Sequence, residues 1–393
     1  MKLTVKHMII AEFVLCIGIV LCIIMGLEQW VSRLFYASFL VLLPSVVFVI
    51  RRQRESTGLL ITTVIASLVA IGFSLLFGHG RFSFGALVYL FVFLALLLYI
   101  HILQDVEPER KLCEFVMLAG ILLSVIFPAA YFIFGIRTGE EYLQMNFSNS
   151  NLLGMWLIQA VLFPLVGICY YSSWAAKGFC IGLAAANVYL LELSGARNAY
   201  LALILGAVLF VLSIWRKRRV SNWILGLVVV FPLVFLWFYM NFLEVLESTE
   251  FLEWLAMESK GVDSRYTMWY SSLYNIRSAW LTGKYFLLGG NVHNSHLTLL
   301  CSYGVVVLCL TMWYLYRALR CVNNSCDSPF QKLCIIAFCV TIFMGNAEGS
   351  LFSGALGLYI PACSFLLLAR HERPVGQTRK MLFSKAKFVW GRK

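Results

Sequence analysis

Residues able to do chemistry gather in the polar stretch 265–303 and in one short turn that precedes it in the chain. A histidine ordinarily titrates near neutral pH, so His293 is a candidate to accept a proton from a hydroxyl. Arg265 and Arg197 carry planar guanidinium groups, which grip phosphate oxygens in pairs. Arg197 lies in a very short turn between two apolar runs, where an arginine at membrane level usually has a partner or a function.

Two arginines and one histidine suit one reaction type, the attack of a hydroxyl on a sugar whose leaving group is a lipid pyrophosphate. The arginines would stabilise the charge that develops on the pyrophosphate. The histidine would orient or deprotonate the attacking hydroxyl. The activated donor supplies the energy, so no nucleotide is required, and the sequence has neither a Walker A motif nor a Gly-x-Gly-x-x-Gly after a strand.

Each of these residues also has a plainer explanation. Arg197 could pair with Glu192, Arg265 could pair weakly with the acidic residues before it, and His293 could be a structural histidine at the membrane surface. The spacing of His293 and His296 invites a metal site. No thiolate lies near them in the loop, however, and a catalytic zinc usually needs three protein ligands, so we expect no metal and no other cofactor.

The composition shows that the bilayer is the solvent of this chain. Of its 393 residues, 61% are hydrophobic and 13% are charged, and the mean hydropathy is +0.85. A soluble domain carries roughly 25% charged residues. In lipid, apolar runs of about 20 residues must be helices, because backbone groups have to be satisfied internally. We therefore predict an all-α, polytopic membrane protein with about twelve spans, near 8–25, 34–50, 58–77, 84–103, 112–135, 152–172, 178–193, 198–215, 222–240, 296–316, 333–346 and 351–369.

The basic residues predict the orientation of these spans. Cytoplasmic loops collect Lys and Arg, and the basic runs 51–54 and 216–219 both fall on the same side as the two termini. Both termini are therefore expected in the cytoplasm. The net charge of +12 then reflects these loops, and no nucleic-acid partner is expected.

Four regions follow from this topology: nine spans in 1–240, a large outer loop in 241–295, three spans in 296–369 and a basic tail in 370–393, which is expected near anionic lipid headgroups. Within the loop, aromatic residues at helical spacing after Asp263 predict a helix on the membrane surface that ends near Gly283. Arg197, Arg265 and His293 all fall on the outer face, which favours a shared role.

Other polar residues of the outer face are candidate substrate ligands. The amide groups of Asn151 and Asn294 suit sugar hydroxyls. Asn151 lies in the segment Asn149-Ser150-Asn151 at the start of a predicted span, and Asn294 directly follows His293. Arg277 and His296 belong to the same polar stretch. We assign these four residues, Asn294, Asn151, Arg277 and His296, to substrate binding.

Several local patterns resemble the O-antigen ligase/polymerase family of bacterial membrane enzymes. The most specific is His293-Asn294-x-x-Leu297 followed by Tyr303-Gly304, placed after the longest outer loop. Three weaker patterns accompany it: Ser194-x-x-Arg197 opening a span, Arg265 followed four residues later by Trp269, and the Asn149-Ser-Asn151-Leu stretch. The run after His293 is most similar to that of the O-antigen polymerases.

The resemblance implies a lipid-carrier-dependent, GT-C-like glycosyltransferase with an undecaprenyl-pyrophosphate-linked donor, inverting transfer and no metal. It implies that Arg197 and Arg265 contact the pyrophosphate and that His293 acts on the acceptor. One departure is Ala196, since the family usually has Ser or Thr directly before this arginine, which leaves the role of Ser194 open.

Other functions stay open at this point. The alternatives within the family are an O-antigen ligase that transfers polysaccharide to lipid A-core and an enzyme that transfers glycans to protein. A flippase of lipid-linked oligosaccharide is the alternative from another class, although the long loop breaks the two-fold repeat that transporters often show. Membrane lipid and a polysaccharide chain-length regulator are the other expected partners.

Overall fold

The computed structural model describes residues 5–44, 55–80, 83–139, 141–215, 219–247, 262–285, 292–346 and 357–371, and within these ranges it contains helices and no strand. The helices are α1 (Val5–Ile24), α2 (Glu28–Leu42), α4 (Glu55–Leu76), α5 (Phe84–Asp105), α6 (Arg110–Pro128), α7 (Ser150–Tyr170), α8 (Trp174–Ser194), α9 (Arg197–Trp215), α10 (Asn222–Glu247), α12 (Val262–Ile276), α13 (Ser295–Asn323), α14 (Pro329–Met344) and α16 (Tyr359–Ala369). A π-helical turn (Ala129–Ile133) extends α6, and a 3-10 turn (Arg277–Ala279) extends α12.

In the described ranges, eight helices are long and apolar enough to cross a membrane, namely α1, α4, α5, α6, α7, α8, α10 and α13. Helices α9, α14 and α16 are apolar but shorter. The prediction of an all-α polytopic membrane protein is thereby confirmed. The number of twelve stays a prediction, because α2 has 15 residues and the expected spans 34–50 and 351–369 run partly outside the described residues.

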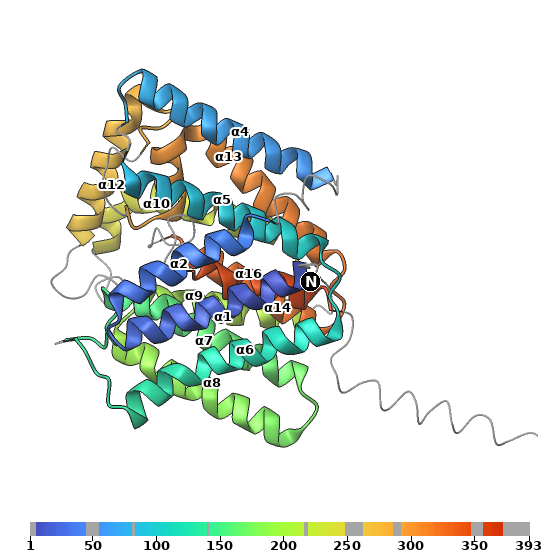
Figure 1. The fold of residues 1–393 in the computed structure, drawn as a ribbon. Helices are drawn as coiled ribbons and strands as arrows, with labels where there is room; N and C mark the ends of the chain where they lie inside the picture. Colours follow the sequence, from blue (N-terminus) through green and yellow to red (C-terminus); the bar gives the residue numbers. More distant parts are fainter. Residues whose placement is uncertain are drawn as a thin grey trace, which may run out of the picture.

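Helices α14 and α16 form the centre of the bundle. Every residue of α16 is buried, and so is every residue of α14 after Pro329. A helix that is apolar all round belongs inside a protein rather than at its surface. Helices α7, α9, α10 and α13 contact α14, while α1, α5, α6 and α13 contact α16. Helix α4 lies beside α13 at one edge of the bundle, and α8 lies at the other edge (Figure 1).

Hydrogen bonds between loops divide the bundle into two ends. At the end that we call the Arg219 end, bonds join segments that the sequence places inside the cell: Lys6 to Glu109, Arg219 to Asp327, and Arg370 to the carbonyls of Leu103 and Val106. At the opposite end, the His293 end, they join segments placed outside: Asn146 to Ile24, Leu143 to Leu193, and Asn198 to Met344. In the structure, these loops therefore lie at two opposite ends of the bundle, as predicted. The N-terminus lies at the end opposite α12 (Figure 1).

Helix α13 is broken near the His293 end by Gly304, which has φ of 81° and ψ of 177°. A β-carbon on Gly304 would lie 2.0 Å from the carbonyl oxygen of Leu281, so only glycine fits. The segment before α13 satisfies the backbone groups that the break exposes: Val305 N donates to Trp280 O, Lys284 N to Cys301 O, and Tyr285 N to Ser302 O. Irregular backbone at membrane depth is tolerated where protein buries it in this way.

Candidate functional site

His293 lies between two anchored neighbours and has a left-handed backbone, with φ of 49°. Its side chain is half-buried. On one side, the buried Trp269 donates from Nε1 to the carbonyl oxygen of Val292 at 2.7 Å. On the other side, Asn294 is fixed as described below. A left-handed non-glycine residue costs about 1–3 kcal/mol and persists only where the surroundings enforce it, often at functional sites.

Asn294 is the N-cap of α13 and is completely buried. Its Oδ1 accepts from Leu297 N at 2.9 Å. Its Nδ2 donates to two carbonyls, Pro232 O of α10 at 3.0 Å and Asn346 O at 2.9 Å. Both polar ends of this amide are therefore used to hold three segments of the chain together. These bonds give Asn294 a role in positioning His293, and its assignment to substrate binding stays a prediction.

The last turn of α14 ties the start of α9 to the start of α13. Three consecutive carbonyls accept one hydrogen bond each: Met344 O from Asn198 Nδ2 at 2.9 Å, Gly345 O from Ser295 N at 2.8 Å, and Asn346 O from Asn294 Nδ2 at 2.9 Å. Arg197 precedes Asn198, and His293 precedes Asn294. The structure thus brings the segments that carry Arg197 and His293, 96 residues apart in the sequence, to a single turn.

Arg265 lies in the first turns of α12 and is half-buried. Trp269, one turn later on the same face, packs against Tyr239 of α10 with ring centroids 5.0 Å apart. Trp269 also belongs to a small buried cluster with Val292 and Leu297. This docking joins the third predicted catalytic segment to the other two. The predicted helix after Asp263 is confirmed, and it turns Trp269 toward the bundle.

The other predicted substrate ligands are less closely gathered. Asn151 is half-buried in the first turn of α7. This turn packs closely against the turn before Arg197, because a β-carbon on Gly154 would lie 2.2 Å from the β-carbon of Ala196. Arg277 is exposed and lies about 18 Å along the α12 axis from Arg265, at about 1.5 Å per residue.

His296 is fully buried, and its Nε2 lies 2.7 Å from the carbonyl oxygen of Val229 in α10. This contact falls in the turn before Pro232, where the proline interrupts the backbone ladder of α10. His296 therefore joins α13 to α10 inside the bundle. No part of this residue is exposed, and its assignment to substrate binding stays a prediction.

Sequence reasoning overlooked Asn198 and the turn Met344–Asn346. The signal for Asn198 was an amide directly after the candidate arginine, at the start of an apolar run. The carbonyls of residues 344–346 carry no signal in the sequence, because every residue has a carbonyl. Among the described residues, no three metal-ligating side chains come together.

Comparison with known proteins finds no matching family model, no matching curated protein and no matching solved structure. Fold and site together define a polytopic helical membrane protein. At one of its ends, buried hydrogen bonds join two arginine-bearing segments to a constrained histidine.

Proposed function

We propose that this protein polymerises undecaprenyl-pyrophosphate-linked oligosaccharide repeat units into O-antigen or capsular polysaccharide, by inverting glycosyl transfer. One observation carries the proposal: the segments with Arg197, Arg265 and His293 are joined at one end of the bundle, and His293 is held in a left-handed conformation there. These are the residues that the motif resemblance assigns to the pyrophosphate and to the acceptor.

The proposed reaction is a single displacement. The acceptor hydroxyl gives its proton to His293 while its oxygen attacks the anomeric carbon of the donor sugar. The bond between that carbon and the pyrophosphate oxygen breaks, and the lipid pyrophosphate leaves with the electron pair. Arg197 and Arg265 stabilise the negative charge on the leaving group. Attack opposite the leaving group inverts the anomeric centre, and both sugars stay attached to lipid carriers until transfer.

The proposed location is the outer face of the bacterial plasma membrane, with both termini in the cytoplasm. The division of loops between two ends supports this location, because the predicted site lies opposite the basic loops. In this arrangement α2, α9, α14 and α16 would complete twelve spans in a GT-C-like architecture. A chain-length regulator is the proposed protein partner.

The test is a polysaccharide ladder from cells that lack this protein and are rescued with wild type, His293→Ala or His79→Ala at equal membrane levels. His79 is a matched control, since it is also half-buried and follows α4 at the His293 end. We expect a full ladder with His79→Ala, and only core plus a single repeat unit with His293→Ala. Long chains accumulating on the carrier lipid would instead indicate a ligase, and loss of repeat units from the outer face would indicate a flippase. A normal ladder with His293→Ala would refute the proposed role of His293.

A further inference from the structure

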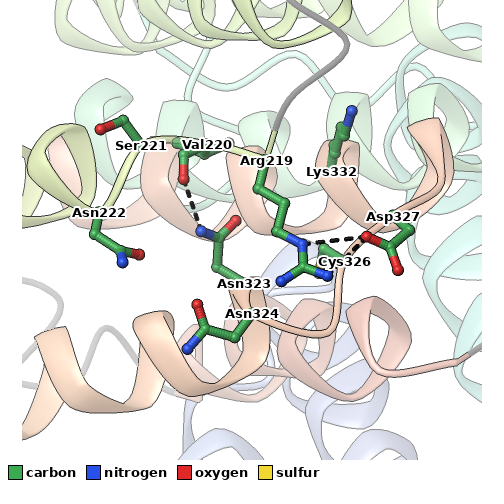
Figure 2. A pocket seen from close by; sticks show the side chains of 9 residues that line it. All are labelled: Arg219, Val220, Ser221, Asn222, Asn323, Asn324, Cys326, Asp327 and Lys332. Atoms are coloured by element: carbon green, nitrogen blue, oxygen red, sulfur yellow. Dashed lines mark hydrogen bonds and ion pairs between the residues drawn. The ribbon is translucent and has the colours of Figure 1, made fainter.

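A polar cleft of about 440 Å³ opens at the Arg219 end, opposite the proposed catalytic site. It lies where α10 begins, α13 ends and α14 begins. Its lining is formed by Arg219, Val220, Ser221, Asn222, Asn323, Asn324, Cys326, Asp327 and Lys332 (Figure 2). Burial raises the pKa of the Cys326 thiol to about 12, so this group stays protonated and adds no charge. The cleft is thus lined by charged and amide side chains in a largely apolar protein.

The charged lining consists of two cations and one carboxylate. Arg219 donates from both Nε and Nη2 to the same oxygen of Asp327, at 3.1 and 2.9 Å. Lys332 is only 6% exposed, although a lysine is rarely buried without a compensating group. The excess of positive charge in the lining favours an anionic ligand, and guanidinium and ammonium groups both bind phosphate.

The amide oxygens in the lining of the cleft can accept hydrogen bonds from a ligand. Asn323 is 1% exposed, and its Nδ2 donates to Val220 O at 2.7 Å, which fixes the orientation of the amide. Its Oδ1 is buried and, among the described residues, has no partner; the same holds for Oδ1 of Asn222. In Figure 2, the Arg219 guanidinium lies between the Asn323 amide and Asp327. A buried acceptor without a donor is unfavourable, so a ligand hydroxyl that donates to it would be stabilising.

We propose that this cleft binds a phosphate ester that carries neighbouring hydroxyl groups, with the phosphate on Arg219 and Lys332 and the hydroxyls on Asn222 and Asn323. Two sources present this chemistry, the headgroup of a lipid such as phosphatidylglycerol and a soluble polyol phosphate. The proposed site is separate from the transfer reaction, and its test requires no polymerase activity.

The experiment uses the full-length protein in maltoside micelles, which contain no phosphate. Phosphatidylglycerol, glycerol 3-phosphate and inorganic phosphate are titrated separately, and binding is followed by the shift in melting temperature and by native mass spectrometry. The variants are Lys332→Met, which keeps the buried stem of the side chain, and Arg219→Gln. Asn222→Ala removes one acceptor amide. Arg320→Gln is the matched control, an exposed cation of α13 outside the lining.

We expect one of the two hydroxyl-bearing phosphates to stabilise wild type and Arg320→Gln, with at least tenfold weaker binding to Lys332→Met and to Arg219→Gln. Asn222→Ala should weaken the binding of that ligand but leave any binding of inorganic phosphate unchanged. A response to phosphatidylglycerol alone identifies the lipid source, and a response to glycerol 3-phosphate identifies the soluble one. Equal binding by wild type, Lys332→Met and Arg219→Gln would overturn the proposal, as would an equal loss in Arg320→Gln or no response to either hydroxyl-bearing ligand.

Discussion

The two ends of the bundle are held together by different forces. At the His293 end, buried amide and indole groups of Asn294 and Trp269 bind backbone carbonyls. At the Arg219 end, bonds from Asn323 and Arg370 to carbonyls are accompanied by ion pairs that are open to water, since the side chains of Arg219 and Asp327 are 46% and 79% exposed. A buried hydrogen bond leaves an unsatisfied group when it is broken, at about 1–3 kcal/mol, whereas an exposed ion pair contributes about 0–1 kcal/mol. The hydrogen bonds at the His293 end therefore fix the backbone around His293, whereas the Arg219–Asp327 pair can rearrange at little cost in free energy.

The largest difference should be seen in activity. Arg197→Ala and Arg265→Ala should each reduce polymer formation by roughly 10²–10³-fold, the typical loss of one preorganised charge-stabilising donor. Arg33→Ala is the control, since this exposed arginine stacks on Trp30 in α2. The measurement is polymer formed per unit of protein in purified membranes. A wild-type rate in Arg197→Ala would show that Arg197 does not act in the proposed reaction.

A smaller effect is expected on stability at the His293 end. Asn294→Ala removes the cap of α13 and leaves two buried carbonyls without their donor, so it should destabilise the protein by about 2–4 kcal/mol. Unfolding in detergent, followed by circular dichroism, measures the change. Asn146→Ala is the control, because Asn146 is exposed and its amide donates to a single carbonyl, that of Ile24. Equal losses in the two variants would contradict the supporting role of Asn294.

Next in size is the anchor on the other side of His293. Trp269→Phe keeps an aromatic ring but removes the donor to Val292 O, which should lower polymer formation about tenfold while changing stability by only about 1 kcal/mol. Trp280→Phe, at a tryptophan that is 55% exposed, should change neither. The ratio of activity loss to melting shift separates positioning from packing. Loss of stability without loss of activity would show that the indole only packs.

The smallest effect is expected at the Arg219 end. Asp327→Asn breaks the exposed pair with Arg219 and should cost less than about 1 kcal/mol. Raising the salt concentration should weaken the pair in wild type and leave the variant unaffected. Chemical unfolding of both proteins at low and high salt measures this. A destabilisation as large as that of Asn294→Ala would erase the distinction between the two ends.

The sequence predicted the features that depend on composition and spacing. Apolar runs placed the helices, basic runs separated the two sets of loops, and aromatic spacing after Asp263 placed α12. The hydrogen bonds of Asn294 and His296 were not predicted, because their partners are carbonyls of Pro232, Asn346 and Val229, more than fifty residues away. A carbonyl is present at every position, so such bonds leave no pattern in the sequence.

The bounds of three helices have an electrostatic consequence. Arg197 is the first residue of α9, Arg265 is the fourth residue of α12, and His293 stands two residues before α13. Aligned peptide dipoles place about half a positive charge at each helix N-terminus. In the proposed site, these three termini would add to the two guanidinium groups a positive charge that no change of pH removes. The ligand that this arrangement favours is a multiply charged anion, and a pyrophosphate is one.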